Sequence, residues 1–187
     1  MSTFLKKGTY LIANPEGTDP NFMRTVVLVC DHNEQGAFGL ILNRTLEITI
    51  SQILPNNPHA IERNELIYFG GPVETSKLFC LHGNQRNNIY NCDKICDGVY
   101  LGTNQACLND WLISDHIHNG FRLYLGYSGW AGGQLENEIE MNYWIVGPAN
   151  GNIVFYPNPE NIWWYILHNI GGHESGDSFD SPYPSLN

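Results

Sequence analysis

TVVLVCDHNEQGAFGLILN, residues 25–43, is the stretch that decides the fold. It holds two continuous apolar runs, TVVLVC at 25–30 and AFGLILN at 37–43, and each is typical of a strand buried on both faces. The polar residues between the runs, 33–36, can form a turn. The pattern predicts an antiparallel hairpin at the centre of the fold.

Shorter segments on both sides of this hairpin complete the predicted fold. Hydrophobic periodicity predicts further strands at 8–13, 66–69, 78–82, 121–125 and 144–146, and helices at 48–54, 104–114, 134–142 and 160–170. Strands and helices mix irregularly, which favours an α+β fold with a mostly antiparallel sheet over a doubly wound parallel fold. A chain of 187 residues fits one domain. We expect this domain to span 1–172, and we expect the polar residues 173–187 to form a disordered tail.

Composition restricts the classes of partner and the compartment. Nine basic residues face nineteen acidic ones, so the net charge is −10. This balance disfavours direct binding to nucleic acid and to anionic membranes, both of which attract Lys and Arg. No run of about 18 apolar residues predicts a membrane span. The segment 1–8 lacks the apolar run of a secretion signal, and the odd number of cysteines, five, favours reduced thiols. We therefore expect a cytoplasmic protein.

Cysteine and histidine residues at strand ends are the first candidates for chemistry. Cys30 and His32 lie two apart, so in a regular strand both side chains point to one face. With His82 from another strand they could form a zinc or thiolate site, or Cys30 could act as a nucleophile beside His32. Zinc ligands usually come as two closely spaced pairs, whereas Cys92 and Cys96 have no second pair. We therefore predict no metal and no cofactor. Packing of Cys30 in the core remains an alternative.

Glycine-rich motifs suggest no catalytic class. In Gly126-Tyr-Ser-Gly-Trp130 a tryptophan stands where the nucleophile elbow G-x-S-x-G needs its second glycine. Gly132 and Gly133 precede a predicted helix, but Glu136 and Glu138 in its first turns would repel a phosphate. These glycines are therefore predicted to serve tight turns.

Four blocks in order carry a resemblance to a known family. They are residues 28–44, 70–73 (GGPV), 81–82 (LH) and 125–139 (LGYSGWAGGQLENEI). The chain resembles the AlgH/YqgE family of bacterial proteins over about residues 8–171. The resemblance implies a bifurcated sheet folded into a pseudo-barrel, with helices packed outside, in a bacterial cytosolic protein. The family is uncharacterised, and one member's name carries the label of a transcriptional regulator.

The family's motif positions give the candidate binding residues. Carried onto this sequence, they are His32, Asn43, Gly71, His82, Trp130, Gln134 and Glu136. Of these, His32, Asn43, His82 and Gln134 could line one cleft that binds a protein or small-molecule partner. Alternatively, the motif residues tie loops to the sheet. We expect a non-catalytic binding or regulatory module. The alternatives are an enzyme that uses Cys30 and His32 on a small molecule, and a transcriptional regulator that acts through a protein partner.

Overall fold

The computed structural model describes residues 5–17, 19–83, 92–113 and 120–170. Its strands are β1 (Thr9–Ala13), β2 (Val26–Asn33), β3 (Gly36–Ile41), β4 (Thr45–Thr49), β5 (Leu66–Phe69), β6 (Val73–His82), β7 (Asp93–Cys96), β8 (Val99–Gly102), β9 (Phe121–Ala131) and β10 (Trp144–Pro148). Its helices are α1 (Ile50–Ile53), α2 (Gln105–Ile113), α3 (Gln134–Glu140), α4 (Gly151–Val154) and α5 (Ile162–Ile170), with a 3-10 turn at Pro159–Asn161.

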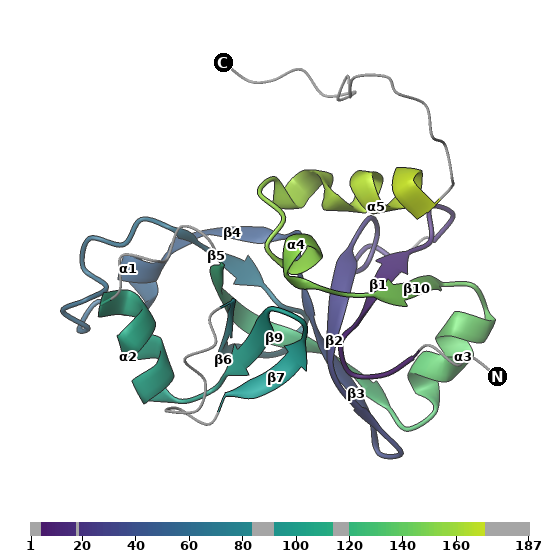
Figure 1. Cartoon of the computed structure of the whole chain (residues 1–187), viewed down its shortest axis with the longest axis horizontal. Helices are drawn as coiled ribbons and strands as arrows, with labels where there is room; N and C mark the ends of the chain where they lie inside the picture. Colours follow the sequence, from purple (N-terminus) through teal and green to yellow (C-terminus); the bar gives the residue numbers. More distant parts are fainter. Residues whose placement is uncertain (1–4, 18, 84–91, 114–119, 171–187) are drawn as a thin grey trace.

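The sheet divides into two branches at β9. The strand order is β10-β1-β2-β3-β9-β6-β8-β7, and β5 joins β9 to β4. The C-terminal part of β9 pairs with β3, whereas its preceding part pairs with β6. Among the described strands, only the β5–β9 pairing is parallel. The sheet curls into a half-barrel with the helices outside it (Figure 1), which confirms the predicted α+β class and the bifurcated, mostly antiparallel sheet.

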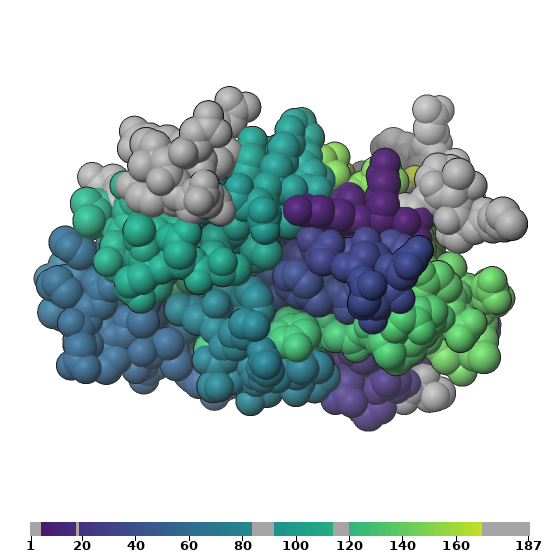
Figure 2. Space-filling model, turned by 90° about the horizontal axis from the view of Figure 1, so that it is seen from below, coloured from purple at the N-terminus to yellow at the C-terminus, as the bar shows by residue number. Residues whose placement is uncertain are grey.

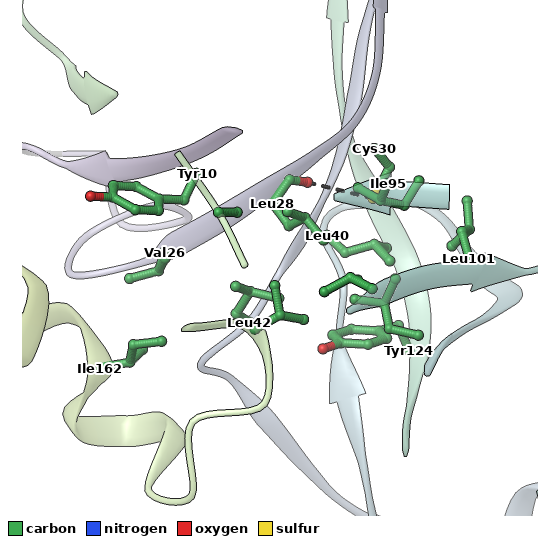
Figure 3. Packing of buried hydrophobic residues seen from close by; sticks show 14 of the residues in the cluster. Tyr10, Val26, Leu28, Cys30, Leu40, Leu42, Ile95, Leu101, Tyr124 and Ile162 are labelled. Carbon is green, nitrogen blue, oxygen red and sulfur yellow. Dashed lines mark hydrogen bonds between the residues drawn. The ribbon is translucent and has the colours of Figure 1, made fainter. Parts of the chain in front are cut away.

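A central core forms where α5 covers the β1–β2 branch. Ile162, Trp163 and Ile166 of α5 are buried, and the Trp163 indole donates to the carbonyl oxygen of Ala13 at 2.8 Å. Figure 3 shows Ile162 on the α5 side of the cluster that also contains Val26 and other strand residues. Burying each such side chain stabilises the fold by about 1.5–3 kcal/mol. Two further apolar clusters lie beneath α2 and beneath α3.

The predicted central hairpin is confirmed, but it contains a β-bulge. Leu28 lies opposite Leu40, as in a regular ladder, and Val29 lies opposite Gly39. The next pair joins Asp31 to Phe38, so Cys30 is an extra residue on β2. A bulge of this kind shifts the alternation of side chains by one position.

Several element boundaries differ from the sequence prediction. The helix predicted at 48–54 begins at Ile50, because Thr45–Thr49 pairs with β5 as a strand. Strands β6 and β9 are longer than predicted, and the short strands β7 and β8 were not predicted. The domain boundary expected at 172 and the tail expected at 173–187 lie outside the described residues. Among the helices that the structure describes, none is long and apolar enough to cross a membrane.

Candidate functional site

Helix α3 is fixed to the β2–β3 hairpin by a histidine–carboxylate contact. The Nε2 atom of His32 lies 2.7 Å from Oε1 of Glu136. Figure 2 shows the dark-blue hairpin segment side by side with the green segment that contains α3. The hydrogen bond from His32 lowers the pKa of the Glu136 carboxyl below its ordinary value of 4.5. The structure therefore brings together two of the predicted site residues.

A second carboxylate of α3, that of Glu138, accepts hydrogen bonds from three side chains. The indole nitrogens of Trp130 and Trp144 donate to its Oε2 atom at 2.9 and 2.8 Å. The amide of Gln134 donates to Oε1 at 2.9 Å, and its own oxygen accepts from the backbone N–H of Ala131. Bonds to an ionised acceptor are stronger than neutral ones. Glu138 therefore holds Trp130 and Gln134 in fixed positions beside Glu136.

A pocket of about 590 Å³ opens next to Glu138. It lies between the segment that precedes β2 and the turn from α3 into β10. That turn is held by Asn142, which adopts a left-handed conformation (φ 60°) and accepts a hydrogen bond from the Asn14 side chain. The pocket is lined by Ala13, Asn14, Glu16, Gly17, Asp19, Phe22, Met23, Glu138, Met141, Asn142, Tyr143 and Trp144.

The pocket wall combines negative charge with aromatic rings. Glu16, Asp19 and Glu138 contribute carboxylates, and no lysine or arginine of the described residues lines it. The Phe22 ring meets the Trp144 ring edge-on at 5.3 Å between centroids. Aromatic faces and carboxylates both attract cations. The wall is therefore suited to a positively charged group.

Cys30 does not join His32, and the prediction of a shared face is wrong. The bulge places His32 opposite Ala37, on the side of α3, whereas Cys30 packs near Leu28 and Ile95 in the central core (Figure 3). Cys30 is 1% exposed, and burial raises the pKa of its thiol. A thiol nucleophile needs access and a lowered pKa. Cys30 has neither, so the packing alternative describes its environment.

Asn43 and Gly71 hold chain segments in place outside this site. The Asn43 side chain accepts from the backbone N–H of Val26 at 2.9 Å and donates to the carbonyl oxygen of Arg24 at 2.8 Å. Gly71 has a φ of 150°, and a Cβ there would lie 2.3 Å from the backbone nitrogen of Ser128. At these two positions the structure favours the alternative in which motif residues tie loops to the sheet.

His82 lies in a separate cluster and lines neither the pocket nor the His32 contact. Its ring stacks on Tyr100 at 5.7 Å and contacts Trp111 at 5.2 Å. One ring nitrogen of His82 (Nδ1 or Nε2) and the sulfurs of Cys92 and Cys107 all lie within 4.8 Å of one another. The pKa of the Cys107 thiol is lowered, first by a hydrogen bond with the Cys80 thiol and then by His82 and Cys92. The predicted meeting of His82 with Cys30 and His32 does not occur.

Comparison with known proteins agrees with the resemblance seen in the sequence. A family model described as AlgH-like matches residues 10–175. The chain belongs to the AlgH-like family. It is 37% identical over 169 residues to a UPF0301 protein of Cytophaga hutchinsonii, covering 90% of this chain and 91% of that one. It is 35% identical over 168 residues to a UPF0301 protein of Chlamydia muridarum, covering 90% and 88%.

Two solved structures share the fold. The solution structure of the AlgH protein from Pseudomonas aeruginosa superposes with a TM-score of 0.74 at 32% identity, covering 91% of each chain. A crystal structure from Corynebacterium diphtheriae gives a TM-score of 0.73 at 24% identity, covering 88% of this chain and 87% of that one, and shows the fold alone. The names of these relatives state no activity, so the site has to be interpreted from its own geometry.

Two features of this AlgH-like chain were missed by sequence reasoning. Glu138 was not among the candidate residues, because nothing in the sequence says which acid of α3 faces the indoles. Cys92 was paired with Cys96, four residues away, whereas in the structure its sulfur lies 3.2 Å from that of Cys107. The sequence did hold one signal for this second cluster: Cys80 and His82 are two residues apart in a predicted strand, so their side chains point to the same face.

Proposed function

We propose that this AlgH-like protein is a non-catalytic binding module whose pocket receives a positively charged group with an apolar stem. The occupant is a lysine or arginine side chain presented by a partner protein. The observation that supports this is the lining of the 590 Å³ pocket, with three carboxylates and no basic residue among the described ones. Regulation would then act through the presence or absence of the partner.

The chemistry of the wall favours a cation over a neutral or anionic group. Two unit charges 4 Å apart attract by about 4 kcal/mol at the effective dielectric of a protein surface, before desolvation is subtracted. The rings of Phe22 and Trp144 add cation–π attraction. Met23 and Met141, which are exposed at the pocket, offer adaptable apolar contact to a side-chain stem.

The whole chain's charge supports the same class of partner. A net charge of −10 accelerates encounter with basic surfaces and opposes contact with DNA phosphates. A regulator of this kind would therefore act through a protein. All five cysteines are free thiols, which supports the cytoplasm as the compartment in which the partner is met.

Binding of single-residue probes tests the proposal. N-acetyl-lysine amide and N-acetyl-arginine amide are titrated against the full chain, with the norleucine and glutamate amides as uncharged and anionic controls. The indole N–H resonances of Trp130 and Trp144 report on binding. We expect millimolar Kd values for the cationic probes, as befits ligands this small, and weaker binding at high salt.

Variants separate the pocket charges from the general charge of the protein. The double variant Glu16→Gln with Asp19→Asn should weaken lysine-amide binding about 10-fold, which corresponds to about 1.4 kcal/mol. Asp19→Asn keeps the side-chain oxygen that accepts from the N–H of Asn21. The double variant Glu34→Gln with Glu47→Gln removes the same two charges at exposed positions outside the pocket and is the matched control. Equal binding of the norleucine probe, or an equal loss in the control, would contradict the proposal.

A further inference from the structure

Four potential soft-metal ligands converge in the branch of the sheet that α2 covers. Cys80 and His82 are two residues apart on β6, Cys92 directly precedes β7, and Cys107 lies in the first turn of α2. The Nδ1 or Nε2 atom of His82 and the two sulfurs of Cys92 and Cys107 are all within 4.8 Å of one another. The sulfurs of Cys80 and Cys107 both lie against Gly102, where an added Cβ would be 3.0 Å from the first and 2.6 Å from the second. None of these residues lines the pocket described above.

The state of His82 distinguishes this cluster from ordinary packing of cysteines. The side chain is buried, with 3% exposure, and among the described residues neither ring nitrogen has a partner with the distance and angle of a hydrogen bond, although the Cys107 sulfur lies within 4.8 Å. A neutral imidazole always carries one donor and one acceptor. Leaving such groups buried and unsatisfied costs about 1–3 kcal/mol each. Cys30, by contrast, packs in the central core and its thiol donates to the carbonyl of Leu28.

We propose that Cys80, His82, Cys92 and Cys107 form a structural zinc site with a Cys3His ligand set. Zinc prefers four tetrahedral ligands, with Zn–S near 2.3 Å and Zn–N near 2.0–2.1 Å, which places ligand atoms about 3.4–3.8 Å apart. The sulfurs of Cys92 and Cys107 lie 3.2 Å apart, and with His82 they form a group within 4.8 Å. The Cys80 thiol, beside Cys107, is the fourth ligand and reaches the ion by a change of its side-chain rotamer. The cysteines bind as thiolates, and their protons pass to solvent.

A closed set of four protein ligands gives the ion a structural role. No position of the coordination sphere is left for water or substrate, unlike a catalytic zinc site. The ion would join three elements that are separate in the sequence: β6, the residue that begins the β7–β8 hairpin, and α2. Its binding free energy would add to the stability of this branch.

Cobalt substitution and mass spectrometry of the full chain test the site. The protein is purified with a phosphine reductant, stripped of metal with a chelator, and titrated with Co²⁺ and then Zn²⁺. We expect the absorption bands of tetrahedral thiolate-bound Co²⁺, saturation at one ion per chain, and displacement by Zn²⁺. Native mass spectra should show one zinc, and Tm should rise with zinc concentration.

A matched pair of cysteine variants locates the site. Cys92→Ser should weaken metal binding at least about 100-fold, since even changes outside the ligand shell cost 10–100-fold. Cys96→Ser should leave binding unchanged, because Cys96 is half-buried like Cys92 but packs against the central core. In the unsubstituted protein, zinc should protect Cys92 from iodoacetamide and leave the reactivity of Cys96 unchanged, a measurement that needs no variant to fold.

Three results would overturn this site. They are the absence of tetrahedral thiolate bands in the folded protein, an equal loss of binding in both variants, and a chain lighter by two hydrogens under reductant, which indicates a Cys92–Cys107 disulfide. Each of these leaves the lysine-amide titration of the pocket unaffected.

Discussion

At the scale of single residues, the Glu138 carboxylate decides how α3 sits on the sheet. Replacing it in Glu138→Gln leaves one neutral acceptor for donors from Trp130, Trp144 and Gln134. We expect a loss of about 1–3 kcal/mol in the free energy of unfolding, because hydrogen bonds to a charged acceptor are among the stronger ones. Urea titration followed by indole fluorescence measures this loss. Glu140→Gln, an exposed change on the same helix, should stay within about 0.5 kcal/mol, and equal effects would argue against the role of Glu138.

At the scale of elements, the His32–Glu136 contact makes the attachment of α3 to the hairpin pH-dependent. The pKa of Glu136 is lower in the folded protein than its ordinary value of 4.5. The ionised carboxylate therefore adds to the free energy of unfolding above pH 4.5, and this stabilisation is lost as the pH falls through the folded pKa. The Glu136 side chain is 44% exposed, and such pairs are worth about 0.2–1 kcal/mol. Glu136→Gln should therefore be less stable than the unsubstituted protein at pH 7 and equally stable near pH 3.

Chemical denaturation at several pH values measures that difference. Glu140→Gln, an exposed change on the same helix that removes the same charge, serves again as the control. The difference in the free energy of unfolding between Glu136→Gln and the unsubstituted protein could instead persist unchanged to pH 3. That result would assign the effect to helix propensity or packing and contradict a role for ionisation.

The central hairpin was predictable because both of its strands are buried on both faces and read as continuous apolar runs. The bulge at Cys30 was not predictable, because a continuous apolar run does not show where one extra residue interrupts the alternation of side chains between the two faces. The prediction that Cys30 and His32 share a face was therefore wrong, because the extra residue turns His32 to the other face of the sheet. Strands β7 and β8 have four residues each, too few for a periodic signal. The contacts of Glu138 and Cys107 join elements far apart in sequence, and local patterns do not encode them.

At the scale of the whole molecule, β9 belongs to both branches of the sheet. Its residue Arg122 attaches it to the segments that follow β3 and α4. The buried guanidinium donates to the carbonyl oxygens of Leu42, Val154 and Tyr156 and lies 4.8 Å from the centroid of the Tyr68 ring. Leu42 directly follows β3, Val154 is the last residue of α4, and Tyr156 lies two residues beyond it. One planar side chain thus links β9 to two distant segments and adds to the stability of the fold. Because β9 itself belongs to both branches, we expect the branches to unfold in a single transition.

Arg122→Met tests this link. The substitution keeps much of the apolar stem but leaves three carbonyl groups without their donor, so we expect a loss of about 3–5 kcal/mol in the free energy of unfolding. Arg122→Lys should fall between, because an ammonium cannot reproduce the planar fork, and Lys94→Met, at an exposed position of β7, should be nearly neutral. Far-UV circular dichroism and tryptophan fluorescence should keep one common midpoint in every variant, since β9 cannot leave one branch without the other. Separate midpoints in Arg122→Met would mean that the branches unfold independently and that Arg122, not β9, is what couples them.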